Sequence, residues 1–191
     1  MEWNVPAKKQ ITKEKILNTA VKIVCQSGID ALNTRTLACA CKCSTQPIYL
    51  SFKGINELLA EVAGEALKIF NRYIEDEIKR GKYPEHKAVG MGYIRFAKEE
   101  KHLFKYLLMN DGMHKTGKEM DSFDNSVFMI MKNFGLYKTD AEKLHLQMWV
   151  FVHGIASMYA TDYMDWDEES VSQLVSSAYR GFMADIKGEN K

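Results

Sequence analysis

The chain has 191 residues, 46% of them hydrophobic and 27% charged, a balance typical of one or two globular domains with a full core. No apolar run reaches the length of a membrane span, and the N-terminal residues MEWNVPAKKQ lack the apolar segment of a signal peptide, which predicts a cytoplasmic protein without a membrane partner. Four cysteines, three of them at Cys39, Cys41 and Cys43, do not resemble a secreted disulfide framework and are interpreted as reduced thiols.

The formal charge is distributed unevenly along the chain. Eight basic and three acidic residues give positions 1–54 a charge of +5, so the remainder of a chain with net charge +1 carries −4. This asymmetry is typical of a nucleic-acid-binding module joined to a second module, although a solvated basic face without a partner has the same charge. We therefore expect a domain over 1–54 and another over 55–191.

Nearly the whole chain is predicted to be helical, because apolar residues recur at intervals of three and four and only three prolines occur. Asn33 is expected to cap the second helix and Ser44 the third, while a capping box of Thr139 and Glu142 begins the penultimate helix. The expected fold class is all-α, with about nine helices. In chain order they cover 12–27, 34–41, 44–52, 55–79, 85–99, 102–109, 120–134, 139–163 and 168–186.

The stretch from 33 to 52 has the spacing of a helix-turn-helix. Ala38 is small, as the crossing of two helices requires; Lys42 lies in the turn four residues later, and Ile48 supplies the apolar closure six residues beyond. The following helix then presents polar side chains that can enter a major groove, unless they form only a solvated face. The predicted DNA contacts are Thr34, Arg35, Lys42, Ser44, Thr45, Gln46, Pro47, Tyr49 and Lys53.

With these motifs in place, the N-terminal third resembles the TetR family of bacterial transcription regulators, from Ile16 to Leu59. Near the other end, Trp149, His153 and Gly154 are similar to a Trp-x-x-x-His-Gly signature of one branch of that family. The resemblance implies a helix-turn-helix domain followed by a helical ligand-binding and dimerisation domain. It also implies a homodimeric repressor that binds a palindromic double-stranded DNA operator and responds to an inducer.

Four positions depart from the family pattern. Lys42 stands in the turn where glycine is usual, and a left-handed lysine costs about 1 kcal/mol relative to glycine. Gln46 and Pro47 replace the usual residues of the recognition helix, so the operator sequence does not carry over from relatives. Ile55 stands where a phosphate-contacting lysine is common.

Aromatic residues and methionines are frequent in the C-terminal part and can line a pocket for a small apolar or amphipathic effector. Ordinary core packing is the alternative for each of them. The predicted pocket residues are Tyr93, Phe96, Phe104, Met109, Phe128, Met131, Trp149 and His153. No cofactor or metal is expected, because His145 and His153 are two helical turns apart and no ligand set has suitable spacing.

The last two predicted helices carry apolar stripes that favour a four-helix bundle across a twofold axis. Packing within a single chain is the alternative explanation of the same stripes. The predicted interface residues are Trp149, Val152, Ala156, Leu174, Ala178 and Phe182.

The sequence thus predicts a ligand-responsive transcription regulator. A helical enzyme is disfavoured, because the chain lacks a paired nucleophile and base, a phosphate-binding glycine loop and a metal-ligand set. A protein-binding adaptor that kept the fold and lost DNA affinity is the other alternative, suggested by Lys42 and Ile55. Its binding would not depend on salt.

Overall fold

The computed structural model describes residues 11–110 and 119–188, with the backbone alone for 119–124. Within these ranges the chain forms nine α-helices, two short helical turns and no strand, which confirms the predicted all-α class. None of these helices is both long enough and apolar enough to cross a membrane. The elements are α1 (Lys13–Ser27), η1 (Ile29–Ala31), α2 (Thr34–Ala40), α3 (Gln46–Ser51), α4 (Ile55–Arg80), α5 (Glu85–Glu99), α6 (Lys101–Phe104), η2 (Lys105–Met109), α8 (Glu119–Phe134), α9 (Lys138–Ala160) and α10 (Glu168–Lys187).

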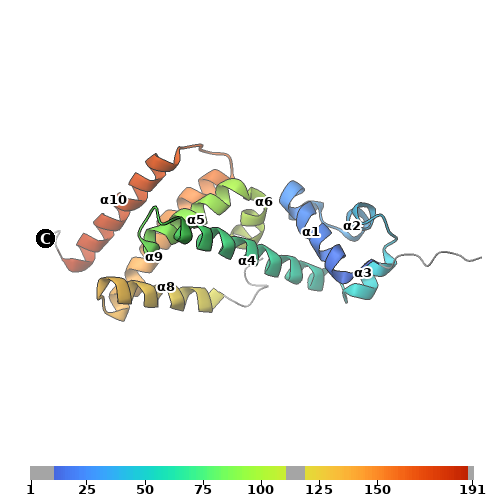
Figure 1. Ribbon diagram of the computed structural model, residues 1–191, viewed down its shortest axis with the longest axis horizontal. Coiled ribbons are helices and arrows are strands. Elements are labelled where there is room, and N and C mark those ends of the chain that lie inside the picture. Colours follow the sequence, from blue (N-terminus) through green and yellow to red (C-terminus); the bar gives the residue numbers. More distant parts are fainter. Residues whose placement is uncertain (1–10, 111–118, 189–191) are drawn as a thin grey trace, which may run out of the picture.

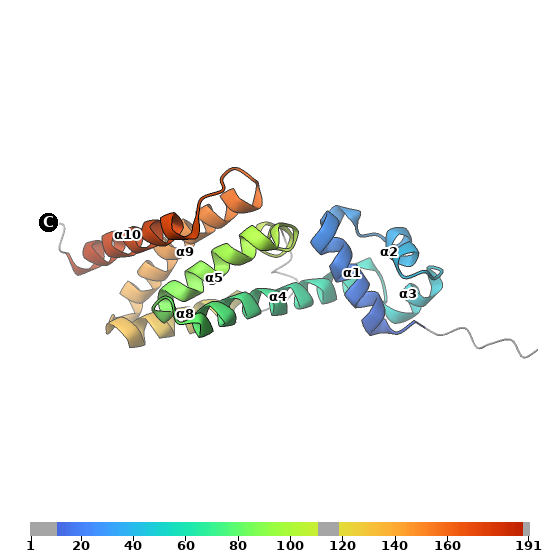
Figure 2. The same ribbon diagram turned by 45° about the horizontal axis from the view of Figure 1, so that its top comes forward.

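The molecule is elongated, with α1, α2 and α3 gathered at one end (Figure 1). The long helix α4 extends from this end into a bundle, where it packs against α5. Helix α9 packs against α5, α8 and α10, and the turned view shows α10 running along the outer side of the bundle (Figure 2). A single apolar core continues from α1 through α4 to α5 and α9, and a smaller cluster joins α8, α9 and α10.

The helix-turn-helix forms because its local signals agree with its packing. Asn33 accepts hydrogen bonds from the backbone amides of Arg35 and Thr36, and the Thr36 hydroxyl accepts one from the Asn33 amide, so the predicted cap of α2 is confirmed. Lys42 has φ +54°, which confirms the left-handed turn. Ile48 is buried against the three-helix core.

The predicted start of α3 is wrong by two residues. Thr45 occupies the cap position and α3 begins at Gln46, without a side-chain cap. A cap at Ser44 would accept a hydrogen bond from the amide two or three residues later, and the residue three later is Pro47, which has no N–H to donate. Ser44 is therefore left in the turn.

Both predicted ends of α9 are also wrong. The helix begins at Lys138, because Tyr137 has an extended backbone and its carbonyl accepts hydrogen bonds from the first-turn amides, so Thr139 lies inside the helix and caps nothing. The helix ends at Ala160, because Asp162 adopts φ +59° and the amide of Tyr163 returns to the carbonyl of Met158 at 2.9 Å. This is the Schellman arrangement of a helix end.

Candidate nucleic-acid interface and effector pocket

The outer face of α3 is held open to solvent by the burial of its inner face. Ile48 and Phe52 are buried in the three-helix core, whereas Gln46 is exposed and Tyr49 retains 63% of its surface. Alternate burial of this kind follows from the helical period, which turns positions 46, 49 and 50 away from position 48. The leading turn of α3 therefore projects from the molecule.

The predicted DNA contacts all lie on α2, on α3 or in the segments that flank α3. Among them the exposed residues are Arg35, Lys42, Ser44, Gln46, Tyr49 and Lys53, and the half-buried residues are Thr34, Thr45 and Pro47. Three cationic side chains thus flank a helix whose exposed groups are an amide and a phenol. Such a surface can contact phosphates with the cations and base edges with the amide.

One exposed residue of this surface was missed by the sequence prediction. Leu50 follows Tyr49 on α3 and is 74% exposed. Because a thymine methyl group is read by apolar contact, Leu50 belongs to the same candidate surface. Its position, two residues after the buried Ile48, was the signal available in the sequence.

Lys13 connects α1 to the beginning of α4. Its Nζ lies 3.5 Å from Glu57 and 2.5 Å from Glu61, and it sits 4.8 Å from the centre of the Phe52 ring. The hydrogen bond to Glu61 raises the pKa of Lys13. Glu57 also accepts a 2.7 Å hydrogen bond from the backbone amide of Lys53, which lowers the pKa of this carboxyl group. These contacts fix the three-helix domain of α1, α2 and α3, called the reading head below, to the first turns of α4.

The cysteines near this surface are free. Cys39 is exposed and Cys41 is buried, and burial raises the pKa of the Cys25 and Cys43 thiols, which keeps these two protonated. No group of three His, Cys, Asp or Glu residues able to hold a metal ion occurs in 11–110 or 125–188.

A second candidate site is a partly open cavity of 340 Å³ lined by residues of α5, α8, α9 and α10. Its volume is at the lower end of the range for small-molecule pockets. The walls are mainly apolar and aromatic, with a few polar side chains among them. The lining residues are Pro84, His86, Lys87, Val89, Gly90, Tyr93, Ser126, Met129, Ile130, Phe134, Leu144, His145, Met148, Trp149, Val152, Val175, Ser176, Tyr179 and Arg180.

Two of the eight predicted pocket residues, Tyr93 and Trp149, line this cavity. His153 lies behind them, where its ring stacks on Trp149 with centroids 5.3 Å apart and its Nδ1 is 2.7 Å from the Tyr93 hydroxyl. Burial raises the pKa of Tyr93 and lowers that of His153, so the hydroxyl donates and the neutral imidazole accepts.

The other five predicted pocket residues lie elsewhere. Phe96 and Phe104 are fully buried in the core beside Tyr93, because their rings pack edge to face around it and Phe70. Met131 packs in the smaller cluster of α8, α9 and α10. The remaining two, Phe128 at 68% exposure and Met109 at 42%, are on the surface.

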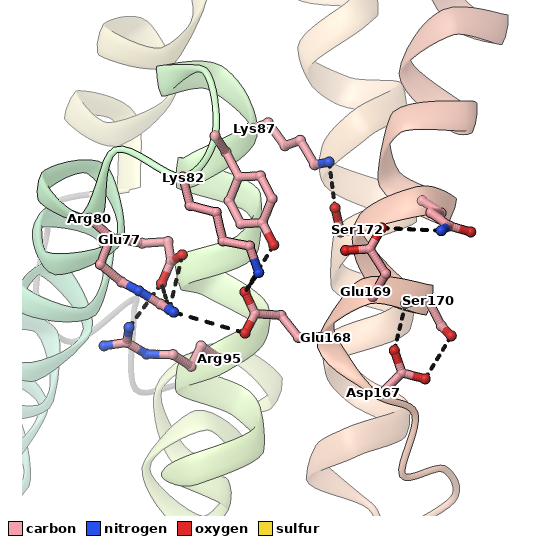
Figure 3. Close-up of polar contacts among 12 residues, drawn as sticks. Glu77, Arg80, Lys82, Lys87, Arg95, Asp167, Glu168, Glu169, Ser170 and Ser172 are labelled. Atoms are coloured by element: carbon pink, nitrogen blue, oxygen red, sulfur yellow. Dashed lines mark hydrogen bonds and ion pairs between the residues drawn. The ribbon is translucent and has the colours of Figure 1, made fainter.

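Polar groups from α5 and α10 meet at one side of the cavity. The ammonium group of Lys87 donates hydrogen bonds to the hydroxyl oxygens of Ser172 at 2.6 Å and Ser176 at 2.8 Å, and Figure 3 shows Lys87 reaching across to Ser172. Desolvation lowers the pKa of Lys87. His86 packs between Phe134 and Tyr179, where burial lowers its pKa. None of these polar residues was predicted from the sequence.

An ion-pair network surrounds the buried Glu77 and its partners on α4 and α5, and extends to α10 (Figure 3). Glu77 of α4 is 1% exposed and accepts hydrogen bonds from Arg80 at 2.9 Å and from Arg95 of α5 at 2.8 Å. Glu168 of α10 accepts a 2.9 Å hydrogen bond from Lys82. Because every carboxylate here has a basic partner, we interpret the network as a structural connection among three helices.

The predicted interface residues divide into two groups. Val152 and Ala156 are buried within the protomer, as the single-chain alternative proposed, and Val152 lines the cavity. Trp149 and Leu174 are exposed, and Ala178 and Phe182 are half-buried.

The exposed apolar face of α9 lies beside the predicted stripe. It carries Leu146, Val150 and Met158, and a side-chain carbon added at Gly154 would meet no atom within 4 Å. Gly181 of α10 is equally open.

A helix-turn-helix thus lies at one end of the described chain, and the cavity lies in the helical bundle at the other. A family model described as "Tetracyclin repressor-like, C-terminal domain" matches residues 86–182, just over half of the chain. The chain therefore belongs to the family of TetR-like transcriptional regulators. Regulators of this family bind DNA and small effector molecules, generally as dimers.

One solved structure shows the same fold. A TetR-like transcriptional regulator from Rhodococcus sp. RHA1 superimposes with a TM-score of 0.69 at 15% sequence identity, over 93% of this chain and 98% of that one. Apo ActR from Streptomyces coelicolor covers 96% of this chain and 100% of its own at 16% identity, but its TM-score of 0.47 is too low to indicate a shared fold. No curated protein sequence matches the chain.

Proposed function

We propose that this protein is a homodimeric repressor that binds a palindromic DNA operator through α3 and is released when a small molecule occupies the cavity. The observation that carries the proposal is the solvent-exposed leading turn of α3. Gln46 and Tyr49 project from a helix whose opposite side, Ile48, is anchored in the core. A helix held in this way is suited to the major groove.

The chemistry of this surface supports sequence-selective binding. The Gln46 amide can pair with adenine through two hydrogen bonds, and Leu50 can contact a thymine methyl group. Tyr49 can donate to a phosphate, and Arg35 with Lys53 can neutralise phosphates on either side of the groove. Binding should weaken steeply as salt concentration rises.

Dimerisation supplies the second reading head that a palindromic site requires. The exposed faces of α9 and α10 support this proposal, because they combine apolar side chains with the open positions Gly154 and Gly181, at which two helices can approach closely. We propose Leu146, Val150, Met158 and Leu174 as the apolar part of this interface.

Contacts of α6 and η2 with α1 and α4 support communication between the helical bundle and the three-helix domain. The Tyr106 hydroxyl in η2 donates a 2.8 Å hydrogen bond to the carbonyl of Leu59 in the first turns of α4. Gly28, at the end of α1, lies against His102 of α6 so closely that an added side-chain carbon would be 3.2 Å from its ring. An effector that binds more tightly to the protein free of DNA would release the operator through such contacts.

The test is a titration of the purified protein against DNA from upstream of its own gene, with Gln46→Ala and Tyr49→Ala beside the wild type. We expect Gln46→Ala to weaken binding about tenfold or more, because a bidentate base contact contributes about 1–3 kcal/mol, and Tyr49→Ala to weaken it through the loss of a phosphate contact. Gln26→Ala, an exposed glutamine of α1, is the matched control and should bind as the wild type does. If both α3 variants bound the DNA as tightly as the wild type, α3 would not be the DNA-binding surface. Binding to a partner that does not depend on salt concentration would instead favour the protein-binding adaptor.

A further inference from the structure

The cavity contains an unbalanced positive charge. Lys87 and Arg180 are among its lining residues, and no aspartate or glutamate lines it among the residues whose side chains are described. The two cations act on each other, since the charge of Arg180 contributes to the lowered pKa of Lys87. Lys87 is half-buried and Arg180 is exposed, and a cavity lined by two cations and by no carboxylate favours an anionic occupant.

The surroundings of Lys87 show that its charge is solvated but not neutralised. Its hydrogen-bond acceptors are the uncharged hydroxyls of Ser172 and Ser176, and its Nζ sits 4.6 Å from the centre of the Tyr83 ring. No carboxylate in 11–110 or 125–188 forms an ion pair with it. The acid that acts on it electrostatically, Glu169, accepts a hydrogen bond from Gln173. A ligand oxygen could therefore take a position that no acidic side chain occupies.

The second cation, Arg180, lies on the same side of α10 as Ser176. Ser176, Tyr179 and Arg180 are spaced by three and four residues, so they share the helix face that borders the cavity. Lys87 approaches this face from α5. A small acidic group between the two helices would thus meet an ammonium, a guanidinium and a hydroxyl, and the planar guanidinium suits a carboxylate.

The remaining walls define the body of the ligand. Tyr93, Phe134, Trp149 and Tyr179 provide aromatic surfaces from four helices, and the flexible side chains of methionines complete them. A cavity of 340 Å³ with such walls suits a compact, flat apolar group.

We propose that the effector is an amphipathic organic acid, with an aromatic body among these rings and a carboxylate held by Lys87 and Arg180. The inference rests on the proposed function, in which this cavity is the effector site. A cationic or neutral ligand of the same shape would leave both basic groups without an ionic partner.

The experiment is a calorimetric titration of the full chain with naphthalene-2-carboxylate and with its neutral isostere, naphthalene-2-carboxamide. We expect the carboxylate to bind at least tenfold more tightly, about 1.4 kcal/mol. Lys87→Met should abolish this preference, while the carboxamide affinity changes less than threefold and shows that the cavity is intact. Lys82→Met is the matched control, because Lys82 pairs with Glu168 and does not line the cavity.

Three outcomes would overturn the inference: equal or tighter binding of the carboxamide, a preference that survives in both Lys87→Met and Arg180→Met, or no binding of either compound. The proposed function is tested separately, by adding the carboxylate to the operator complex. If the carboxylate binds with the expected preference but leaves operator affinity unchanged, the cavity is an anion site but not the effector site.

Discussion

At Lys42 the backbone of a lysine adopts φ +54°, a conformation that costs little only for glycine. The turn requires it because the amide of Cys43 must reach back to the carbonyl of Ala38, at 3.0 Å, before α3 can begin. The residue is exposed, and its positive charge lies beside α3. At this position glycine would stabilise the turn, whereas lysine supplies a positive charge that we propose contacts DNA.

We expect Lys42→Gly to raise the free energy of unfolding by about 1 kcal/mol, because it removes the strain of a left-handed side chain. Chemical denaturation measures this change. Lys42→Ala is the control, since alanine keeps the strain while losing the charge, and it should not stabilise the protein. If alanine stabilises as much as glycine does, backbone strain is not the cause.

At the scale of elements, α4 and α5 are held together by close approach and by a buried carboxylate. A side-chain carbon at Gly92 of α5 would lie 2.9 Å from the carbonyl oxygen of Tyr73, so the two helices could not pack as they do with a larger residue. One turn further along α4, Glu77 binds Arg95 of α5 and Arg80 of its own helix. The close packing and the ion pairs therefore depend on each other.

Glu77→Gln should lower the free energy of unfolding by about 2–3 kcal/mol, because the charged hydrogen bonds to both arginines are weakened in a place with little solvent. Thermal or denaturant unfolding measures the loss. Glu75→Gln, on the same helix, removes an exposed pair with Lys79 and should cost less than about 0.5 kcal/mol. Equal effects of the two substitutions would show that the burial of Glu77 does not increase its contribution to the free energy of unfolding.

At the scale of the whole molecule, the reading head and the outer faces of α9 and α10 lie at opposite ends of an elongated protomer (Figure 1). A twofold contact through α9 and α10 would leave both α3 helices free to reach successive half-sites. The open positions Gly154 and Gly181 fall on the faces that this arrangement would bring together.

Leu174→Glu should therefore convert the proposed dimer to a monomer, with a dissociation constant raised about a hundredfold, since an unpaired buried charge costs about 3 kcal/mol. Analytical ultracentrifugation measures the mass, and operator binding should weaken in parallel. Leu50→Glu places the same charge on α3 and should leave the mass unchanged. A Leu174→Glu protein that remains fully dimeric at micromolar concentration would exclude this face.

The helix-turn-helix could be predicted from sequence because its determinants are local. Ala38, Lys42 and Ile48 lie within eleven residues, and the burial of one residue sets the exposure of its neighbours through the helical period. Where the prediction was wrong, at the start of α3, the decisive fact was also local, namely the missing N–H of Pro47.

The cavity and the apolar outer face were decided only by tertiary packing. Helix α9 has apolar residues around its whole circumference, so periodicity could not distinguish Val152, which is 6% exposed, from Val150, which is 57% exposed. Lys87 and Ser176 are 89 residues apart and meet only because α5 and α10 pack together. The amino-acid sequence by itself determined the helices and the reading head, whose contacts are short in range, whereas long-range packing decided which side chains surround the cavity.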